Sequence, residues 1–178
     1  MEHLYFLRHF QTASNKSGLL HGRSLDIPIE SGHPILCDHP IDAIYCSNAL
    51  RCRQTLKYFT ESHKNIPICY TDLLLERSLG SLESQPRDEA VNAYPELFHG
   101  RKLQLTCTPP QGESFEQFKN RAHQFINTYV KNNEHKNILI CSHNQFLKML
   151  YFILMDLDLS QENWESINFP FGEIKQIL

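Results

Sequence analysis

Two short apolar segments in this chain of 178 residues each lead into a histidine. The first, Leu4–Leu7, is followed by Arg8 and His9, and the second, Ile138–Cys141, is followed after one serine by His143. Short runs of consecutive apolar residues are typical of strands that are buried on both faces of a parallel sheet. The carboxyl ends of such strands lie at one edge of the sheet, where α/β proteins bind ligands. The sequence therefore predicts that the two histidines converge at that edge.

The rest of the chain alternates between strand-like and helix-like patterns. The helix over 113–131 is the clearest, because its apolar residues recur at spacings of three and four. This alternation predicts an α/β fold with a mostly parallel central sheet. We expect strands over 3–8, 41–45, 66–70, 138–141 and 173–178, and helices over 49–62, 87–94, 113–131 and 145–155.

Local signals add detail to this outline. Pro67 places its strand near an edge of the sheet, because proline lacks the N–H that a strand ladder needs. Ser47 or Asn48 is expected to cap the helix over 49–62. Glycine, proline, asparagine and aspartate predict a long loop over 10–32, and such loops are usually functional. The buried face of the helix is expected to contain Leu50, Thr55, Leu56 and Phe59.

The composition fits one globular domain that covers residues 1–178. A net charge of -3 argues against nucleic-acid binding, which favours a basic surface. The six cysteines form no Cys-x-x-Cys pair, which favours reduced thiols in the cytosol. The N-terminus shows no basic leader, and the apolar run Phe146–Met155 is interrupted by Lys148 and is too short to cross a membrane. We therefore expect a cytoplasmic protein that binds neither nucleic acid nor membranes.

Arg51 falls in the first turn of the helix over 49–62, at the same predicted sheet edge as His9 and His143. A helix N-terminus attracts anions, and an arginine adds two parallel donors for a phosphate. A neutral imidazole is a competent nucleophile toward phosphorus, and a leaving alkoxide needs a nearby carboxylic acid. Each residue alone is more often a surface or core-edge side chain. Together with Arg8 they indicate a site for a dianion, with His9 as the nucleophile.

Several segments resemble, in order along the chain, the motifs of the histidine phosphatase superfamily (phosphoglycerate mutase-like). The first matches its Arg-His-Gly-Glu/Gln-Thr…Asn signature, and a later one resembles its Ser-x-x-x-Arg-x-x-Gln-Thr corner between a strand and a helix. The matching segments span nearly the whole chain and are Leu7–Thr12 with Asn15, Gly22–Gly32, Tyr45–Thr55, Leu75–Glu83, Gly112–Ser114 with Arg121, and Ile138–His143.

The resemblance implies a three-layer sandwich, in which helices flank the mostly parallel central sheet. It implies that His9 is the phosphorylated nucleophile and that Glu76 is the proton donor, with Glu83 as a weaker candidate. It implies no metal or organic cofactor. The residues that it places at the phosphoryl group or at the mouth of the pocket are Arg8, Arg51, His143, Asn15 and Gln11.

Two positions depart from the family pattern. Phe10 follows the nucleophile, and Asn144 follows the second histidine, where the family has glycine at both places. A bulky residue beside the nucleophile restricts the backbone and is expected to narrow the pocket. Phe10 and Asn144 are therefore added to the candidate site residues.

The function implied by the resemblance is a phosphomonoesterase that acts on a small phosphorylated molecule. A phosphomutase uses the same chemistry, but the segment that can form a cap, about 81–112, has little material to exclude water. A catalytically weak phospholigand-binding module and a metal site at His9 and His143 are further alternatives. The cap is expected to be basic, and thus suited to an acidic substrate, if its cations face the pocket: Arg87, His99, Arg101 and Lys102. The sequence carries no signal of oligomeric state.

Overall fold

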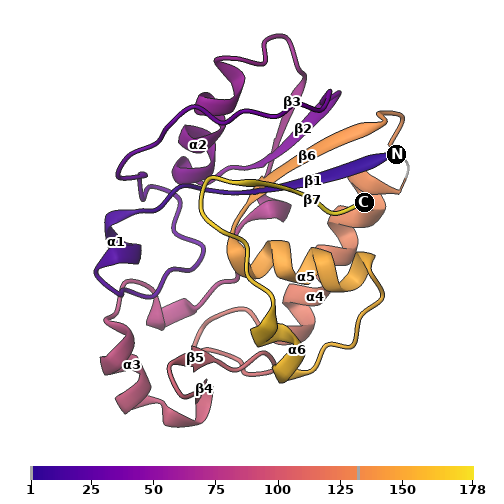
Figure 1. Ribbon diagram of the computed structural model, residues 1–178. Helices are drawn as coiled ribbons and strands as arrows, with labels where there is room; N and C mark the ends of the chain where they lie inside the picture. The colour runs from indigo at the N-terminus through magenta and orange to yellow at the C-terminus, as the bar shows by residue number, and fades with distance from the viewer. Residues whose placement is uncertain (1, 132) are drawn as a thin grey trace.

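Five strands form one central sheet in the computed structural model, which describes residues 2–131 and 133–178 (Figure 1). The order across the sheet is β3-β2-β6-β1-β7, and the first four strands run parallel, whereas β7 pairs antiparallel with β1. The strand with Pro67 before it lies at an edge, as predicted. The strands are β1 (His3–Arg8), β2 (Ala43–Ser47), β3 (Ile68–Thr71), β6 (Asn137–Ser142) and β7 (Ile174–Gln176).

The helices lie close to where the sequence pattern places them. The four predicted helices correspond to α2, α3, α4 and α5, and the mostly parallel α/β architecture is confirmed. Their bounds, with those of two shorter helices, are α1 (Ala13–Lys16), α2 (Leu50–Thr60), α3 (Arg87–Ala93), α4 (Phe115–Phe125), α5 (Asn144–Leu154) and α6 (Gln161–Ser166).

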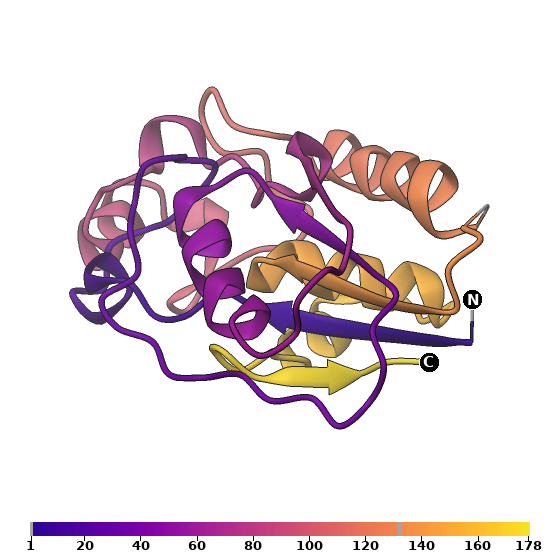
Figure 2. The ribbon, with the colours of Figure 1, turned by 90° about the horizontal axis from the view of Figure 1, so that it is seen from above.

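The three layers follow from the side-chain alternation of the central strands. In β1, Leu4 and Phe6 pack with α4 and α5 on one face of the sheet. The intervening Tyr5 and Leu7 pack with Leu56 and other residues of α2 on the opposite face. Figures 1 and 2 show α2 on one side of the sheet and α4 with α5 on the other. Helices thus cover both faces, which confirms the predicted sandwich.

The register between β1 and β6 positions the two histidines. Arg8 pairs with Ser142 across the parallel ladder. The backbone N–H of His9 then donates to the Ser142 carbonyl at 3.1 Å. The two imidazole rings come to lie edge to face with centroids 5.2 Å apart. The predicted convergence of His9 and His143 at one sheet edge is therefore confirmed.

The start of α2 differs from the prediction. Ala49 occupies the cap position, and its methyl group cannot accept a hydrogen bond. Ser47 instead accepts from the Ala49 N–H at 3.3 Å and contacts the ring of His143 at 2.9 Å. Leu50 is 36% exposed, whereas Cys52 is buried against the sheet. Thr55, Leu56 and Phe59 lie on the buried face as predicted, and the prediction was wrong for Leu50.

Other segments are more ordered than expected. The loop over 10–32 contains the single turn of α1, which begins with a capping box between Thr12 and Asn15. The segment over 98–111, where no strand was expected from the sequence, holds a small antiparallel hairpin of β4 (Phe98–His99) and β5 (Lys102–Leu103). Short 3-10 turns occur at Asp72–Leu74, Gly80–Leu82 and Pro95–Leu97, and α4 continues into a π-helical turn at Ile126–Val130.

Candidate active site

A cavity of about 140 Å³ lies at the carboxyl ends of β1 and β6. It brings together most of the residues predicted from the sequence, together with others that the sequence did not single out. Its walls combine cations, imidazoles and one carboxylate, so the cavity is suited to an anion. The lining residues are Arg8, His9, Asn15, Leu19, His21, Arg51, Glu76, Arg87, His143, Asn144 and Gln145.

His9 is buried, with 5% of its surface exposed. Its Nδ1 atom lies 2.6 Å from the carbonyl oxygen of Phe10, which can only accept a hydrogen bond. The proton of a neutral ring therefore sits on Nδ1, and Nε2 keeps its lone pair. Burial, followed by the positive charge of Arg51, holds the pKa of His9 well below its ordinary value. His9 is thus a neutral imidazole whose Nε2 carries no proton at neutral pH.

His143 has partners at both ring nitrogens, and Sγ of Cys52 also lies 3.5 Å from its Nε2. Its Nδ1 accepts from Nε of Arg51 at 3.2 Å, which leaves Nε2 to donate to Oγ of Ser47 at 2.9 Å. Burial and the charge of Arg51 lower the pKa of His143 well below its ordinary value. His143 is therefore neutral and fixed in one tautomer, and it orients Arg51.

The two predicted arginines have different surroundings. Arg51 donates to the carbonyl oxygens of Gly22 and Ser24, at 3.0 and 2.6 Å, so the loop before α2 holds its guanidinium. Arg8 donates to the Phe169 carbonyl at 2.8 Å, and its guanidinium carbon lies 3.6 Å from the centre of the Phe171 ring. Burial lowers the pKa of Arg8 to about 10, so it remains a cation at neutral pH.

Glu76 is the carboxylate of the cavity and is buried. Its Oε1 accepts from the N–H groups of Arg77 and Phe146, at 3.0 and 3.1 Å. Its Oε2 accepts from the N–H of Gln145 at 3.1 Å, so the carboxyl group sits at the N-terminus of α5. Burial raises the pKa of Glu76, although these backbone donors and the two arginines oppose the shift. The environment therefore favours the protonated acid more than water does.

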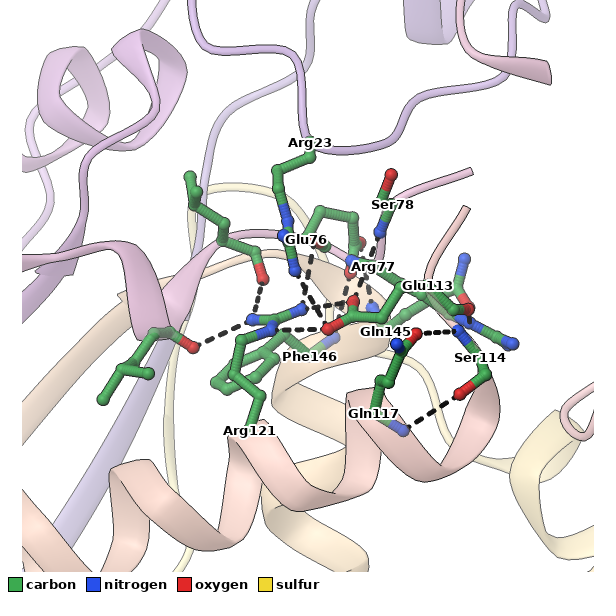
Figure 3. Close-up of polar contacts among 12 residues, drawn as sticks. Arg23, Glu76, Arg77, Ser78, Glu113, Ser114, Gln117, Arg121, Gln145 and Phe146 are labelled. Atoms are coloured by element: carbon green, nitrogen blue, oxygen red, sulfur yellow. Dashed lines mark hydrogen bonds and ion pairs between the residues drawn. The ribbon is translucent and has the colours of Figure 1, made fainter. Parts of the chain in front are cut away.

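A network of ion pairs holds the backbone of Glu76 in place (Figure 3). Arg121, on α4, donates to the carbonyl oxygens of Leu73 and Leu75 at 2.9 and 2.7 Å and to that of Glu76 at 3.3 Å. The same guanidinium is paired with the carboxylate of Glu113 at 2.7 Å. Glu113 directly precedes the N-cap of α4, which has a capping box between Ser114 and Gln117. The Glu113 and Arg121 motifs identified in the sequence thus fix the backbone position of Glu76.

Two further predicted residues, Asn15 and Asn144, also line the cavity. The Oδ1 atom of Asn15 accepts from the N–H and the hydroxyl of Thr12, at 3.1 and 2.9 Å, so its amide NH₂ group is the donor that remains. The Oδ1 atom of Asn144 accepts from the Phe169 N–H at 3.0 Å. Asn144 therefore joins the start of α5 to the segment that packs on Arg8.

Of the residues that the structure describes, Gln11 and Glu83 were predicted for the site and do not line the cavity. The carbonyl of Gln11 accepts from Glu30 N–H at 3.0 Å, in the loop outside the pocket. The carboxylate of Glu83 accepts from the Arg23 N–H at 3.0 Å and from the Ser24 hydroxyl at 2.9 Å. Glu83 therefore holds the loop that binds Arg51.

Phe10 does not narrow the pocket, contrary to the expectation from the sequence. Its ring is 4% exposed and packs with the core on the α2 face of the sheet. It contacts the rings of His33 and Tyr58, with centroids 4.9 and 5.5 Å away. Gly172 lies against the same ring, and a Cβ there would overlap with it. The side chain points away from His9 because successive residues of an extended backbone face opposite sides.

His21 and Arg87 line the cavity and were not predicted as site residues from the sequence. The Nε2 atom of His21 lies 3.1 Å from the hydroxyl of Thr12, and burial lowers the pKa of His21 to about 4. The chain has ten histidines, and His21 does not follow a predicted strand as His9 and His143 do, so the sequence provided no reason to select it. Arg87 opens α3, where it was expected to belong to a basic cap.

The remaining cations of the predicted basic cap are paired with carboxylates. His99 and Lys102 contact Glu165 at 3.0 and 2.9 Å, and Arg101 pairs with Asp88. Arg87 alone of the predicted cap cations reaches the small cavity. The positive charge of the site thus comes from Arg8, Arg51 and Arg87.

Across residues 2–131 and 133–178, no group of three or more His, Cys, Asp and Glu side chains is arranged to hold a metal ion. Within the same residues, every helix is too short or too polar to cross a bilayer.

Comparison with known proteins places this arrangement in a family. The model of the histidine phosphatase superfamily (branch 1) matches residues 4–174. A Schizosaccharomyces pombe protein named as a probable phosphatase is 31% identical over 159 residues, which is 83% of this chain and 70% of that protein. The adenosylcobalamin/alpha-ribazole phosphatase of Salmonella typhimurium is 26% identical over 162 residues, which is 86% of this chain and 80% of that protein.

The fold is shared with solved structures. The crystal structure of the alpha-ribazole phosphatase from Shigella flexneri superposes with a TM-score of 0.80, covering 98% of this chain and 89% of that chain at 22% identity. The family model spans nearly the whole sequence and includes both histidine-bearing strand ends. The chain therefore belongs to the histidine phosphatase superfamily (branch 1), and it is a phosphatase.

Proposed function

We propose that this phosphatase hydrolyses a small phosphomonoester in two steps, with His9 as the nucleophile. Nε2 of His9 attacks phosphorus and forms an N–P bond, while the ester oxygen leaves with the proton of Glu76. Water then attacks the phosphohistidine, gives a proton to the Glu76 carboxylate and releases inorganic phosphate. The observation that carries this proposal is the hydrogen bond from Nδ1 of His9 to the Phe10 carbonyl, which leaves Nε2 unprotonated in a cationic cavity.

Charge on the transferring phosphoryl group would be stabilised by Arg8 and Arg51, with the amide of Asn15 at the mouth. Three of the five N–H groups of Arg51 have protein partners, which leaves two for phosphoryl oxygens. We assign His143 to positioning Arg51, because direct donation to a phosphate would require Nε2 to leave Ser47. All of these roles are filled by side chains, so we propose a reaction without a metal or organic cofactor.

We propose that residues 1–178 form one domain and that about 81–112 act as its cap. The cap residues Leu82, Ala90, Phe98 and Leu103 share a small core with Leu20 and Leu79, beside the active-site cavity. Two backbone hydrogen bonds join Leu20 to Ser84 and Gln85, and the N–H of Arg87 donates to the Gly18 carbonyl. The cap is thus anchored to the loop that follows the nucleophile.

The alpha-ribazole phosphatases named above act on a small phosphorylated molecule according to their names, which supports a small substrate here. A cap of about thirty residues offers little cover against water, so we propose hydrolysis in preference to phosphomutase transfer. We also propose a cytoplasmic location, supported by cysteines that are all free thiols.

The proposal is tested by trapping the intermediate. The wild-type protein should take up acid-labile label from a ³²P-labelled phosphodonor and should hydrolyse p-nitrophenyl phosphate in the presence of a chelator. His9→Ala should abolish both signals. His135→Ala is the matched control, because His135 is exposed on the turn before β6 and should leave both unchanged.

Each contrary result has a distinct meaning. Labelling that persists in His9→Ala would refute the assigned nucleophile. A wild-type protein that binds phosphate esters but neither hydrolyses them nor becomes labelled would be a phospholigand-binding module. Transfer of the label to a second metabolite, in place of release as inorganic phosphate, would identify a phosphomutase.

A further inference from the structure

A second cavity of about 370 Å³ adjoins the active-site cavity. The two cavities share four lining residues, His21, Arg87, Asn144 and Gln145. A molecule whose phosphoryl group is at His9 would therefore extend its organic part into this second cavity. Its apolar wall is formed by Leu20, Leu79, Leu103 and Ile167.

Lys148 lines this second cavity and is an unusual residue for its position. It lies on α5, whose neighbouring residues Leu147 and Met149 are fully buried in the core, and only 6% of the Lys148 surface is exposed. A lysine on a buried helix face normally extends its ammonium group to the solvent. Here the side chain is retained inside, at the wall of a cavity that continues from the active site.

The ammonium group of Lys148 has an aromatic neighbour but lacks a carboxylate partner. Its Nζ lies 4.4 Å from the centre of the Trp164 ring. Within residues 2–131 and 133–178, no carboxylate forms an ion pair with it, and Glu165 at the same wall pairs with His99 and Lys102 instead. Burial lowers the pKa of Lys148 to about 8, so most of the group is charged at neutral pH.

A buried cation without an anionic partner is costly, whereas an anion that enters the cavity would supply the missing partner. The walls of the second cavity also carry Arg87 and Lys102 against one carboxylate, Glu165. Arg87 lies where the two cavities meet, and its guanidinium donates to a backbone carbonyl, that of Arg101, at 3.0 Å. The second cavity is therefore positive as well as partly apolar.

We propose that the substrate carries a second anionic group, a carboxylate or a phosphate, on its organic part, and that Lys148 binds this group in the second cavity. Arg87 assists at the junction of the two cavities, and the apolar wall contacts the carbon chain between the two anionic groups. This inference rests on the proposed function, because the first phosphoryl group is placed at His9.

A matched series of three-carbon esters tests the inference. The compounds are propyl phosphate, 3-aminopropyl phosphate, 3-phosphooxypropanoate and propane-1,3-diyl bisphosphate, which differ in the charge at the far end. The two anionic compounds should have kcat/KM values at least about tenfold above propyl phosphate, the scale of one hydrogen bond to a charged group. The aminopropyl ester should be the poorest substrate. Comparison of the two anionic compounds separates a carboxylate site from a phosphate site.

Variants then assign the preference to Lys148. Lys148→Met keeps the length and packing of the side chain, and should remove most of the anionic preference with little change on p-nitrophenyl phosphate. Lys148→Arg should retain much of the preference. Lys57→Met, at an exposed position of α2, is the matched control and should behave as the wild type. Thermal unfolding of each variant checks that the fold is intact.

Binding measurements separate this inference from the proposed reaction. Calorimetric titration of the same four esters into His9→Ala should give the same order of affinity without turnover. Equal kcat/KM values across the series, in an enzyme that hydrolyses p-nitrophenyl phosphate, would overturn the role of Lys148. The expected order of binding, combined with no turnover by the wild-type protein, would overturn the proposed reaction and leave the anion site standing.

Discussion

The Nδ1 atom of His9 lies 2.6 Å from the carbonyl oxygen of Phe10, so the residue after the nucleophile fixes the tautomer of the nucleophile. This contact is made by the backbone of Phe10 and does not depend on its side chain. The family pattern has glycine at this position, and a glycine carbonyl would serve equally well. The bulky substitution is therefore compatible with the proposed chemistry.

The pH dependence of kcat/KM should show an optimum on the acidic side. His9 acts as a neutral nucleophile, so activity requires a pH above its pKa, which burial and Arg51 hold well below 6.5. Glu76 acts as an acid, so activity requires a pH below its pKa, which burial raises above 4.5. We expect kcat/KM to fall as the pH rises through the Glu76 pKa, measured over about pH 4 to 9. Glu76→Gln should lose this alkaline limb, and identical profiles in the two proteins would contradict the assignment.

Loss of the Glu76 proton should matter most for poor leaving groups. An alkyl alkoxide needs a proton as it departs, whereas p-nitrophenolate does not. Glu76→Gln should therefore slow the hydrolysis of propyl phosphate far more than that of p-nitrophenyl phosphate. Steady-state kinetics on both esters measures the difference. An equal loss on both would argue that Glu76 has a structural role, such as holding the N-terminus of α5.

Removal of the Ser47 hydroxyl should weaken both the fold and the site. Ser47→Ala removes the nearest acceptor of the buried Nε2–H of His143 and leaves only the weaker Sγ of Cys52 at 3.5 Å, which is expected to cost about 1 to 3 kcal/mol of unfolding free energy. The His143 ring is then no longer held in the tautomer that accepts from Arg51, so kcat/KM should also fall. Urea unfolding and steady-state kinetics measure the two effects. Ser62→Ala, whose hydroxyl donates to the Phe59 carbonyl near the end of α2, should leave kinetics unchanged.

Neutralising Glu113 should disturb Glu76 from a distance. Glu113→Gln breaks the pair with Arg121, whose side chain is 11% exposed, and removal of one partner of a buried pair costs about 3 kcal/mol or more. Arg121 also holds the backbone of Glu76, so the alkyl ester should lose more activity than the aryl ester. Glu116→Gln on the exposed side of α4 is the control. A stable variant with unchanged kinetics would show that the network does not position Glu76.

Truncation of Phe10 should separate stability from catalysis. Phe10→Ala removes a buried ring and should lower the unfolding free energy by about 3 to 5 kcal/mol, measured by urea denaturation. Activity per folded molecule should stay close to that of the wild type, because the Phe10 carbonyl is retained. Leu36→Ala, at a residue that is 74% exposed, should change neither quantity appreciably. A large loss of activity in folded Phe10→Ala would place the ring at the active site.

The sheet and its edge were predictable because they depend on local patterns. The apolar runs before His9 and His143 identified two adjacent parallel strands, and the sheet then brings the histidines together. The start of α2 was less predictable, because the polar residue before it, Ser47, is used by a histidine 96 positions away. A hydrogen bond to a residue far away in the sequence thus outweighs the local preference of serine for the cap position.

The contacts that the side chains of the site make could not be predicted from single residues. Arg51 was expected to present its guanidinium to an anion, and much of it is held by carbonyls of the loop at Gly22 and Ser24. The direction of the Phe10 ring depended on the exact end of the strand. Lys148 did leave a signal, since it is the charged residue that interrupts the apolar run 146–155. Only the fold shows that this interruption faces a cavity.

The closing segment of the chain has a consequence for the order in which the protein is made. Arg8 is held by the carbonyl of Phe169, which is 161 positions later, and its own carbonyl accepts from the N–H of Gly172 at 2.9 Å. Arg8 ends β1, which lies between β6 and β7, the last two strands of the chain to be synthesised. Contacts of such long sequence separation are slow to form. On the ribosome, a nascent chain that already contains the nucleophile therefore lacks the pocket, and phosphatase activity should first appear after Gly172 has left the exit tunnel.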